Sequence, residues 1–275
     1  MKRKISWKGE MATTRTNIKQ IQRPKSRKKK KSNTPSPWRF WIGVGVLVLL
    51  VLLVLYIELL VEKPRPVWPE GHSVYGVDVS HYQKQVDWAQ VKENEVTFAF
   101  IKATEGVTLQ DRKFEENWEG AEKAGIIKGA YHFYLPYLNP KEQAAHFISK
   151  VKLNPGDLPP VLDVEVRGKR PAEQFRKDLK VWLDRVEAAY GAKPIIYTGY
   201  KFYVDYLAGH FDDYHLWIAH YKVSKLRLEK DVKTKLAFWQ HTDGGVVKGI
   251  EGVVDCNVFY GSMRELRSIC IKPEE

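Results

Sequence analysis

A stretch without any charged residue, from Phe40 to Ile57, limits what this chain can form more than any other feature. Three further apolar residues follow Glu58, which brings the stretch close to the length of a membrane span. An α-helix needs about 20 apolar residues to cross the hydrocarbon core of a bilayer. The sequence therefore predicts a single transmembrane helix over residues 38–61. Aromatic residues, which favour the membrane interface, lie near its ends: Trp38, Trp41 and Tyr56.

Two other interpretations fit this stretch less well. A core helix of a globular domain has a polar side, whereas residues 40–57 are apolar all round. A cleaved signal peptide has a shorter apolar region, and small residues mark its cleavage site. No such site is found between Glu58 and Pro69, so we expect an uncleaved anchor.

The positive charge of the chain is concentrated before the apolar stretch. Residues 1–39 contain 14 of the 45 Lys and Arg residues and one acidic residue, Glu10, so the rest of the chain is almost neutral. By the positive-inside rule, the run Arg27–Lys31 predicts a cytoplasmic N-terminus and an extracytoplasmic domain after residue 61, in the periplasm or outside the cell. Because membrane topology accounts for the basic charge, we expect no nucleic-acid partner.

The predicted anchor divides the chain into four parts. Residues 1–37 are basic and polar, which is typical of a disordered cytoplasmic tail. Residues 62–74 contain three prolines, which indicates a semi-rigid spacer after the anchor at 38–61. Residues 75–275 then form the folded domain.

Short apolar runs alternate with longer helical patterns through the folded domain. Strands are predicted at 75–80, 97–102, 129–134, 161–165, 195–198, 216–220, 237–240 and 253–257. Helices are predicted at 87–94, 113–124, 140–151, 171–190 and 202–207. Eight strands with helices that become sparse at the end predict an α/β fold, a TIM-like (β/α) barrel of mostly parallel strands with a reduced helix count. An open doubly wound sheet is the alternative, but no glycine-rich phosphate-binding motif follows a strand.

Two carboxylates two residues apart, Asp163 and Glu165, end the buried strand at 161–165. Alternate residues of a strand point to the same side, so these two groups share one face. Mutual repulsion and loss of water raise the pKa of at least one of them, which suits a general acid. Asp78 and Asp255 end the first and last strands, which become neighbours when a barrel closes, so we expect them to flank the same site.

Other strand ends carry aromatic and polar groups. Sugar rings stack on aromatic side chains, and their hydroxyls bind to charged groups and amides, so these positions predict a polysaccharide site. The candidate binding residues are Lys102, Tyr131, Phe133, Tyr197, Trp217, Tyr221, Trp239 and Gln240.

Other kinds of site are not indicated. The histidines lack the H-x-x-x-H and H-E-x-x-H spacings, the two cysteines form no C-x-x-C pair, and no G-x-S-x-G motif occurs. We therefore expect neither a metal nor another cofactor. Cys256 and Cys270 could form a disulfide in an oxidising compartment, or they could be a buried cysteine and a free thiol.

An ordered set of motifs in the folded domain resembles glycoside hydrolase family 25, the N-acetylmuramidase lysozymes that cut peptidoglycan. The resemblance covers residues 74–260. The motifs are G-x-D-x-S-x-Y-Q at 76–83, Y-H-F at 131–133, D-x-E at 163–165, W-x-A-x-Y at 217–221, W-Q at 239–240 and D-x-N at 255–257. One departure is His241, which stands where an aromatic or apolar residue is more usual.

The resemblance implies a barrel and cleavage of the β-1,4 bond between N-acetylmuramic acid and N-acetylglucosamine. It implies that Glu165 is the general acid, Asp163 its partner carboxylate, and Asp78 and Asp255 supporting acids. Strand neighbours lie roughly 6.5–7 Å apart on one side of the substrate, and a direct nucleophile lies about 5–5.5 Å from the acid. We therefore expect Asp163 to assist the substrate acetamido group, with an inverting mechanism as the rival. The alternative functions are a chitinase-like hydrolase and an inactive glycan-binding membrane-anchored module.

Overall fold

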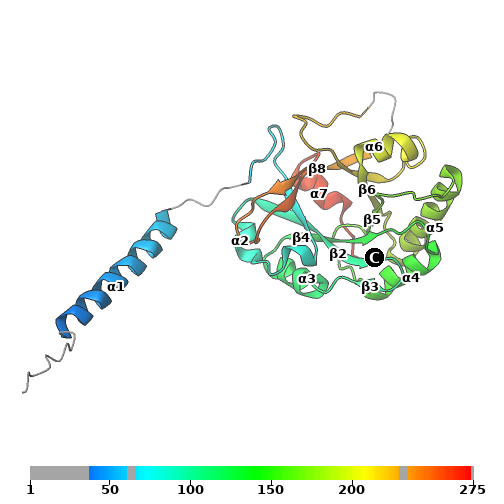
Figure 1. Cartoon of the computed structure of the whole chain (residues 1–275). Helices are drawn as coiled ribbons and strands as arrows, with labels where there is room; N and C mark the ends of the chain where they lie inside the picture. Colours follow the sequence, from blue (N-terminus) through cyan, green and yellow to red (C-terminus); the bar gives the residue numbers. More distant parts are fainter. Residues whose placement is uncertain (1–36, 61–65, 229–234, 274–275) are drawn as a thin grey trace, which may run out of the picture. The chain divides into compact units, whose positions relative to one another are not determined.

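The computed structural model describes residues 37–60, 66–228 and 235–273. The predicted cytoplasmic tail, up to residue 36, and residues 62–65 of the predicted spacer lie outside this range. The chain divides into two compact units, one up to Val61 and one from Glu62 (Figure 1). Each unit is described by itself.

The described part of the first unit is one long helix, α1, Pro37–Leu60. Its window Trp38–Ile57 has a mean hydropathy of 2.9, and none of that window is buried inside the protein. Leu49, Leu52 and Leu55 each expose half or more of their surface. A helix that presents apolar side chains on all sides needs an apolar environment, so α1 fits a membrane span by length and composition.

The second unit is a closed barrel of eight strands with one short additional strand at its rim (Figure 1). The strands are β1 Tyr75–Val79, β2 Val96–Glu105, β3 Leu109–Gln110, β4 Ile127–Phe133, β5 Val161–Asp163, β6 Ile195–Gly199, β7 His215–Ala219, β8 Lys235–Gly245 and β9 Val254–Phe259. The order β1-β9-β8-β7-β6-β5-β4-β2 is closed by pairing of β1 with β2, and β3 pairs with β2 alone. This confirms the predicted barrel and excludes the open sheet.

Strand direction changes at one place in the barrel. All barrel neighbours are parallel except β9, which runs antiparallel to both β8 and β1. Strand β8 continues to Gly245, past the predicted end at residue 240, and forms a long hairpin with β9. An antiparallel partner needs no crossover helix, which is why the helices become sparse toward the end of the chain.

Helices cover the outside of the barrel (Figure 1). They are α2 Trp88–Lys92, α3 Phe114–Lys123, α4 Pro140–Lys150, α5 Ala172–Tyr190, α6 Tyr200–Phe202 and α7 Met263–Ile269, with shorter turns η1 His81–Gln83 and η2 Tyr203–Leu207. Local signals set several of their ends. The side chain of Asn139 accepts from the amide of Lys141 at the start of α4, and Gly191 ends α5 with a φ of 63°.

Alternation along the strands creates two apolar layers. The barrel interior holds Phe98, Phe100, Trp217, Phe238 and other aromatic residues, while a larger outer layer packs between strands and helices. The final helix α7 adds Leu266 and Cys270 to the interior layer. The amide of Ile271 donates to Asp157 O just before β5, so the segment after α7 lies at the N-terminal end of the barrel.

The two cysteines are free and buried, so the alternative with a disulfide is wrong. The neighbours of Cys256 on β9, Asp255 and Asn257, belong to the site side of the strand, so Cys256 faces the outer layer. Cys270 belongs to the interior layer. The two sulfur atoms are thus on different sides of the barrel wall.

Candidate active site

A pocket of about 200 Å³ lies at the C-terminal ends of the parallel strands. This is the end at which barrels of parallel strands carry their chemistry. Ten of the twelve predicted site residues line it, and the four unpredicted residues come from the last position of β1 and the turn that follows it. The lining residues are Asp78, Val79, Ser80, Tyr82, Gln83, Lys102, Tyr131, Phe133, Asp163, Glu165, Tyr197, Trp217, Gln240 and Asp255.

Amide side chains orient Asp78 on one wall of the pocket. Gln240 Nε2 and Asn257 Nδ2 donate to Asp78 Oδ2 at 2.7 and 2.8 Å. Each amide is itself fixed by a donor to its oxygen: Trp217 Nε1 donates to Asn257 Oδ1 at 2.7 Å. Gln240 Oε1 accepts from the hydroxyls of Tyr197 and Tyr221 at 2.7 and 2.5 Å. Because both the oxygen and the nitrogen of each amide are hydrogen-bonded, the orientation of Asp78 is well determined.

Asp78 and Asp255 act as an acid pair. They are cross-strand partners on β1 and β9. Burial raises the pKa of Asp78 well above its usual value, and the charge of Asp255 raises it further. Burial also raises the pKa of Asp255, while the hydrogen bond from Asp78 lowers it. The pair shares a hydrogen bond, and burial favours the proton on Asp78, which then donates to the Asp255 carboxylate.

Asp163 and Glu165 face the same pocket from the end of β5. Asp163 lies in register between Phe133 on β4 and Tyr197 on β6, and it is only 5% exposed. Burial raises its pKa well above the usual value, the charge of Glu165 adds to this, and Lys102 opposes it. The Oδ1 atom of Asp163 is buried and has no hydrogen-bond partner. A buried acceptor of this kind is available for a donor on a bound substrate.

Glu165 lies two residues further along and is exposed to solvent at the mouth of the pocket. Partial burial raises the pKa of the Glu165 carboxyl group. The positive charge of Lys102 lowers this pKa, and the negative charge of Asp255 raises it. The pocket cation Lys102 is held in place by two contacts. Its Nζ lies 2.7 Å from Glu105 Oε2 and 5.0 Å from the centre of the Phe133 ring. The pocket thus combines one cation with four carboxyl groups, two of which, Asp78 and Asp163, are buried.

The structure places two predicted binding residues outside the pocket lining. Trp239 is 1% exposed and packs in the outer layer, where its Nε1 donates to His220 O at 2.8 Å. It faces outward because its neighbour Gln240 faces inward. Tyr221 does not line the pocket but acts on it through Gln240. We therefore no longer assign substrate binding to Trp239.

Of the four unpredicted lining residues, Val79 ends β1, and the other three belong to the turn after it, for which the sequence carries a signal. Ser80 and Gln83 form a capping box around η1, with Ser80 Oγ accepting from Tyr82 N and Gln83 Oε1 accepting from Ser80 N at 3.0 Å. The spacing S-x-x-Q at the end of a strand predicts such a turn. It presents Tyr82, 76% exposed, at the edge of the pocket.

His132, within the Y-H-F motif, is structural. It is fully buried and stacks on Trp182, its Nδ1 lies 2.7 Å from Thr104 Oγ1, and its Nε2 lies 3.2 Å from Gln143 Oε1. Gln143 Oε1 also accepts from the Leu135 amide, so Nε2 is the protonated nitrogen. Burial lowers the pKa of His132 to about 3. Among the described residues, no group of three or more His, Cys, Asp or Glu side chains is arranged to hold a metal ion.

Known proteins resemble this chain in sequence and in fold. The profile of the "Glycosyl hydrolases family 25" matches residues 77–250. The chain is 44% identical over 205 residues to YegX, an uncharacterized protein of Escherichia coli K12, covering 73% of this chain and 74% of that protein. It is 34% identical over 210 residues to Lysozyme M1 of Streptomyces globisporus, covering 71% of each chain.

Solved structures agree with the sequence comparison. A bacterial lysozyme from Streptomyces coelicolor superposes with a TM-score of 0.69 at 32% identity, covering 73% of this chain and 98% of that one. A family 25 glycosyl hydrolase from Bacillus anthracis also gives 0.69 at 32% identity, covering 76% and 99%. The profile match spans more than half of the chain and includes Asp78, Asp163 and Glu165, while Asp255 lies beyond its end. The chain therefore belongs to glycosyl hydrolases family 25 and is a glycoside hydrolase of the lysozyme type.

Proposed function

We propose that this protein cleaves the β-1,4 bond between N-acetylmuramic acid and N-acetylglucosamine in peptidoglycan. The observation that carries the proposal is the pair Asp163 and Glu165, two carboxyl groups with raised pKa values in one pocket of a family 25 barrel. Relatives named lysozyme and N,O-diacetylmuramidase support the choice of substrate over chitin.

In this proposal Glu165 is the general acid. A raised pKa increases the share of Glu165 that carries a proton at a given pH, as a general acid requires. Its position at the open side of the pocket gives it access to the oxygen of a bound glycosidic linkage. The Glu165 proton moves to that leaving oxygen as the bond to the muramic C1 breaks. The resulting carboxylate then takes a proton from the water that attacks C1, and the bond that the substrate acetamido oxygen had formed to C1 breaks.

Asp163 assists the substrate acetamido group. The acetamido oxygen of the muramic residue attacks C1 from the face opposite the leaving group, and its N–H becomes more acidic as positive charge develops. The unpartnered Oδ1 of Asp163 is suited to accept a hydrogen bond from that N–H. Asp163 is the last residue of β5 and Glu165 follows two residues later. Their backbones are thus roughly 6.5–7 Å apart along an extended chain, which suits this arrangement better than direct attack by a carboxylate.

The remaining pocket residues bind and orient the sugar. Asp78 and Asp255 form the acid wall that the amides of Gln240 and Asn257 hold in place. Tyr131, Tyr197, Phe133 and Trp217 provide aromatic surface for sugar rings, and the charge of Lys102 partly offsets the repulsion between Asp163 and Glu165. Tyr82 extends this surface beyond the pocket.

We further propose that α1 anchors the enzyme in a membrane. Its length and hydropathy support a span, and the basic residues before it support a cytoplasmic N-terminus. The barrel then lies on the extracytoplasmic side, where peptidoglycan is found. Protease added to spheroplasts should remove the barrel and leave an N-terminal fluorescent fusion intact, and a protected barrel would contradict this topology.

Product analysis tests the proposed reaction. The full chain in detergent is incubated with purified peptidoglycan, the fragments are reduced with borohydride, and the reduced sugar is identified by mass spectrometry. Reduced muramic acid at the new ends is expected, and reduced glucosamine would contradict the bond assignment. NMR of the first anomer formed tests the mechanism, because acetamido participation requires retention and an inverted product would exclude it. A parallel reaction with a soluble chitin oligomer measures the alternative substrate.

A further inference from the structure

A second pocket, of about 540 Å³, opens between the loops that follow β4 and β5. Pro136 and Tyr137 line one side, and residues 167–171 line the other. Both loops leave the C-terminal ends of neighbouring parallel strands, so the pocket lies on the same end of the barrel as the catalytic site. Neither its residues nor its charge enter the function proposed above.

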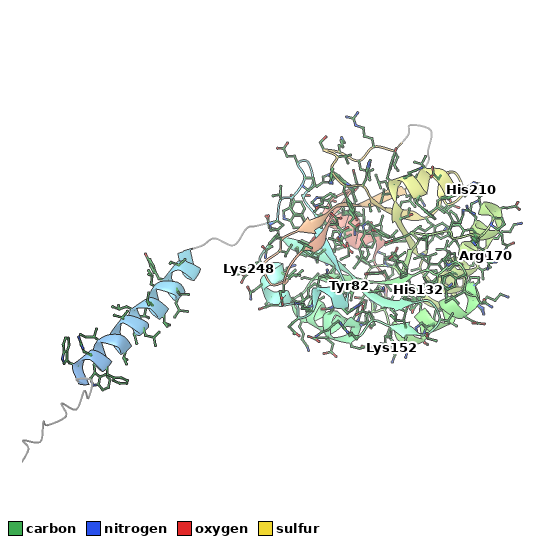
Figure 2. All side chains as sticks on the ribbon, viewed as in Figure 1. Tyr82, His132, Lys152, Arg170, His210 and Lys248 are labelled. Atoms are coloured by element: carbon green, nitrogen blue, oxygen red, sulfur yellow. The ribbon has the colours of Figure 1, made fainter. Side chains whose placement is uncertain are left out.

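Three cationic side chains line this pocket, and only one of them has an anionic partner. Arg170 donates from Nε to Pro136 O at 3.0 Å, and its Nη2 lies 3.2 Å from Asp178 Oδ2 (Arg170 is labelled in Figure 2). Arg167 and Lys169 have no carboxylate partner among the residues that the structure describes. The pocket therefore has an excess of positive charge.

Arg167 packs against an aromatic ring, but one of its hydrogen-bond donors has no partner. Its guanidinium carbon lies 5.1 Å from the centre of the Tyr206 ring. Its Nε is buried and has no hydrogen-bond partner within the described chain. An unpaired buried donor is unfavourable, and a guanidinium binds carboxylates through two parallel hydrogen bonds. Arg167 and Lys169 together are thus suited to an anionic group that enters the pocket from outside.

The position of Arg167 relative to the catalytic acid limits the identity of that group. Arg167 is two residues from Glu165, so their backbones are at most roughly 7 Å apart. The muramic residue whose linkage reaches Glu165 also carries the lactyl group and, through it, the stem peptide of peptidoglycan. That peptide has free carboxylates, and it begins within a few bonds of the scissile linkage.

We propose that the pocket around Arg167 and Lys169 binds a carboxylate of the stem peptide on the muramic residue that is being cut. The proposal rests on the proposed muramidase function and specifies its substrate as peptide-bearing glycan. The aromatic surface of Tyr137, 72% exposed at the pocket edge, packs against the peptide backbone.

Steady-state kinetics on two matched substrates test this proposal. Soluble glycan strands are prepared with their stem peptides or after removal of the peptides by an amidase, and both are first freed of phosphate polymers with hydrofluoric acid. The wild-type enzyme should have a KM about tenfold lower on peptide-bearing strands, as expected for one well-placed ion pair. Arg167→Gln should remove this difference by raising KM on peptide-bearing strands alone, and Arg167→Lys should retain part of it because it keeps the charge.

A charge-matched control separates this site from general attraction. Lys152→Gln removes one exposed positive charge from the segment between α4 and β5 (Lys152 is labelled in Figure 2). This variant should change the KM for neither the peptide-bearing nor the peptide-free strands. Equal effects of Arg167→Gln on both substrates, or none on either, would overturn the proposal. So would an effect that appears only on walls that retain phosphate polymers, because the anion would then be a phosphate. Failure of the wild-type enzyme to cut either substrate would instead count against the muramidase function itself.

Discussion

The two ends of the barrel both bury charged side chains, but they treat them in opposite ways. At the N-terminal end, Lys128 Nζ lies 2.5 Å from Asp157 Oδ1 and 4.7 Å from the centre of the Trp118 ring. Asp157 Oδ2 accepts from the amide of Asn154 at 2.8 Å. Both groups are almost fully buried, and each has partners of the opposite kind.

At the C-terminal end, carboxyl groups gather with too few cations. Asp78 and Asp163 are 7% and 5% exposed, and the one cation lining their pocket, Lys102, is already 2.7 Å from Glu105. Removing a charge from water without a counter-charge is unfavourable for folding. At the N-terminal end, here called the paired end, the buried charges stabilise the fold. At the C-terminal end, here called the unpaired end, buried carboxyl groups lower stability and are retained because the reaction needs their raised pKa. The predictions below test this contrast.

The largest expected effect is loss of activity at the unpaired end. Glu165→Gln removes the transferable proton and should lower kcat by roughly 10³-fold, within the usual range for general acid catalysis. Asp163→Asn should have an effect nearly as large. Release of soluble fragments from peptidoglycan measures both. Glu119→Gln, which neutralises an exposed acid on α3, is the control, and either site variant retaining a tenth of the activity would contradict the assignment.

The next largest effect is expected on the free energy of unfolding when the ion pair at the paired end is broken. Lys128→Met leaves Asp157 buried without its cation and should lower the free energy of unfolding of the barrel by about 3–5 kcal/mol. Chemical denaturation measures this change, and kcat at temperatures where the variant is folded should equal that of the wild type. The double variant Lys128→Met/Asp157→Leu should recover much of the loss. A loss below about 1 kcal/mol in the single variant would mean that this pair is hydrated.

The sequence predicted the barrel and most of the pocket because both follow from alternation. Apolar runs separated by helical patterns fix the strand positions, and the residue types at strand ends identified ten of the fourteen lining residues. Strand direction could not be predicted in this way, because an apolar run does not distinguish a parallel strand from an antiparallel one. The antiparallel course of β9 depends on pairing with β8 and β1, which local patterns do not contain.

Other features depended on register or on partners distant in the sequence. Trp239 and Gln240 are adjacent, so only their pairing to β9 and β7 decides which one faces the pocket. The pair Lys128 and Asp157 is separated by 29 positions and has no motif. Helix α7 was missed although its signal was present, since Ser262 and Glu265 form a capping box at its start.

A substitution at the unpaired end should have a smaller effect on stability than Lys128→Met, and it should stabilise the protein instead of destabilising it. Asp163→Asn removes a buried carboxyl group whose desolvation Lys102 offsets only in part, and it should raise the free energy of unfolding by about 1 kcal/mol at neutral pH, while activity is lost. The effect depends on pH because the folded-state pKa of Asp163 is raised. Its contribution to stability is fully present below the unfolded pKa of about 3.9 and is lost as pH rises through the folded value.

The stability difference between Asp163→Asn and the wild type should therefore increase as pH rises from about 4 to 8. Thermal unfolding of both proteins across this range measures it. Asp87→Asn is the matched control, because hydrogen bonds from Gln90 lower the pKa of Asp87 at the start of α2 and its stabilising effect is lost as pH falls. A constant or decreasing difference for Asp163→Asn would show that this carboxylate is balanced in the folded protein.

The smallest effect concerns the hydroxyls that hold the amide chain behind Asp78. Tyr197 and Tyr221 both donate to Gln240 Oε1, so either one alone keeps that oxygen satisfied. Tyr221→Phe and Tyr197→Phe should each lower the free energy of unfolding by about 0.5–1.5 kcal/mol and reduce kcat/KM only a few-fold. The double variant is different, because Gln240 then has no donor to fix its amide and can rotate away from Asp78. Its loss in kcat/KM should exceed the product of the single losses, and a double-mutant cycle measures the excess. Additive losses would mean that the two hydroxyls act independently and that Asp78 is held by Asn257 alone.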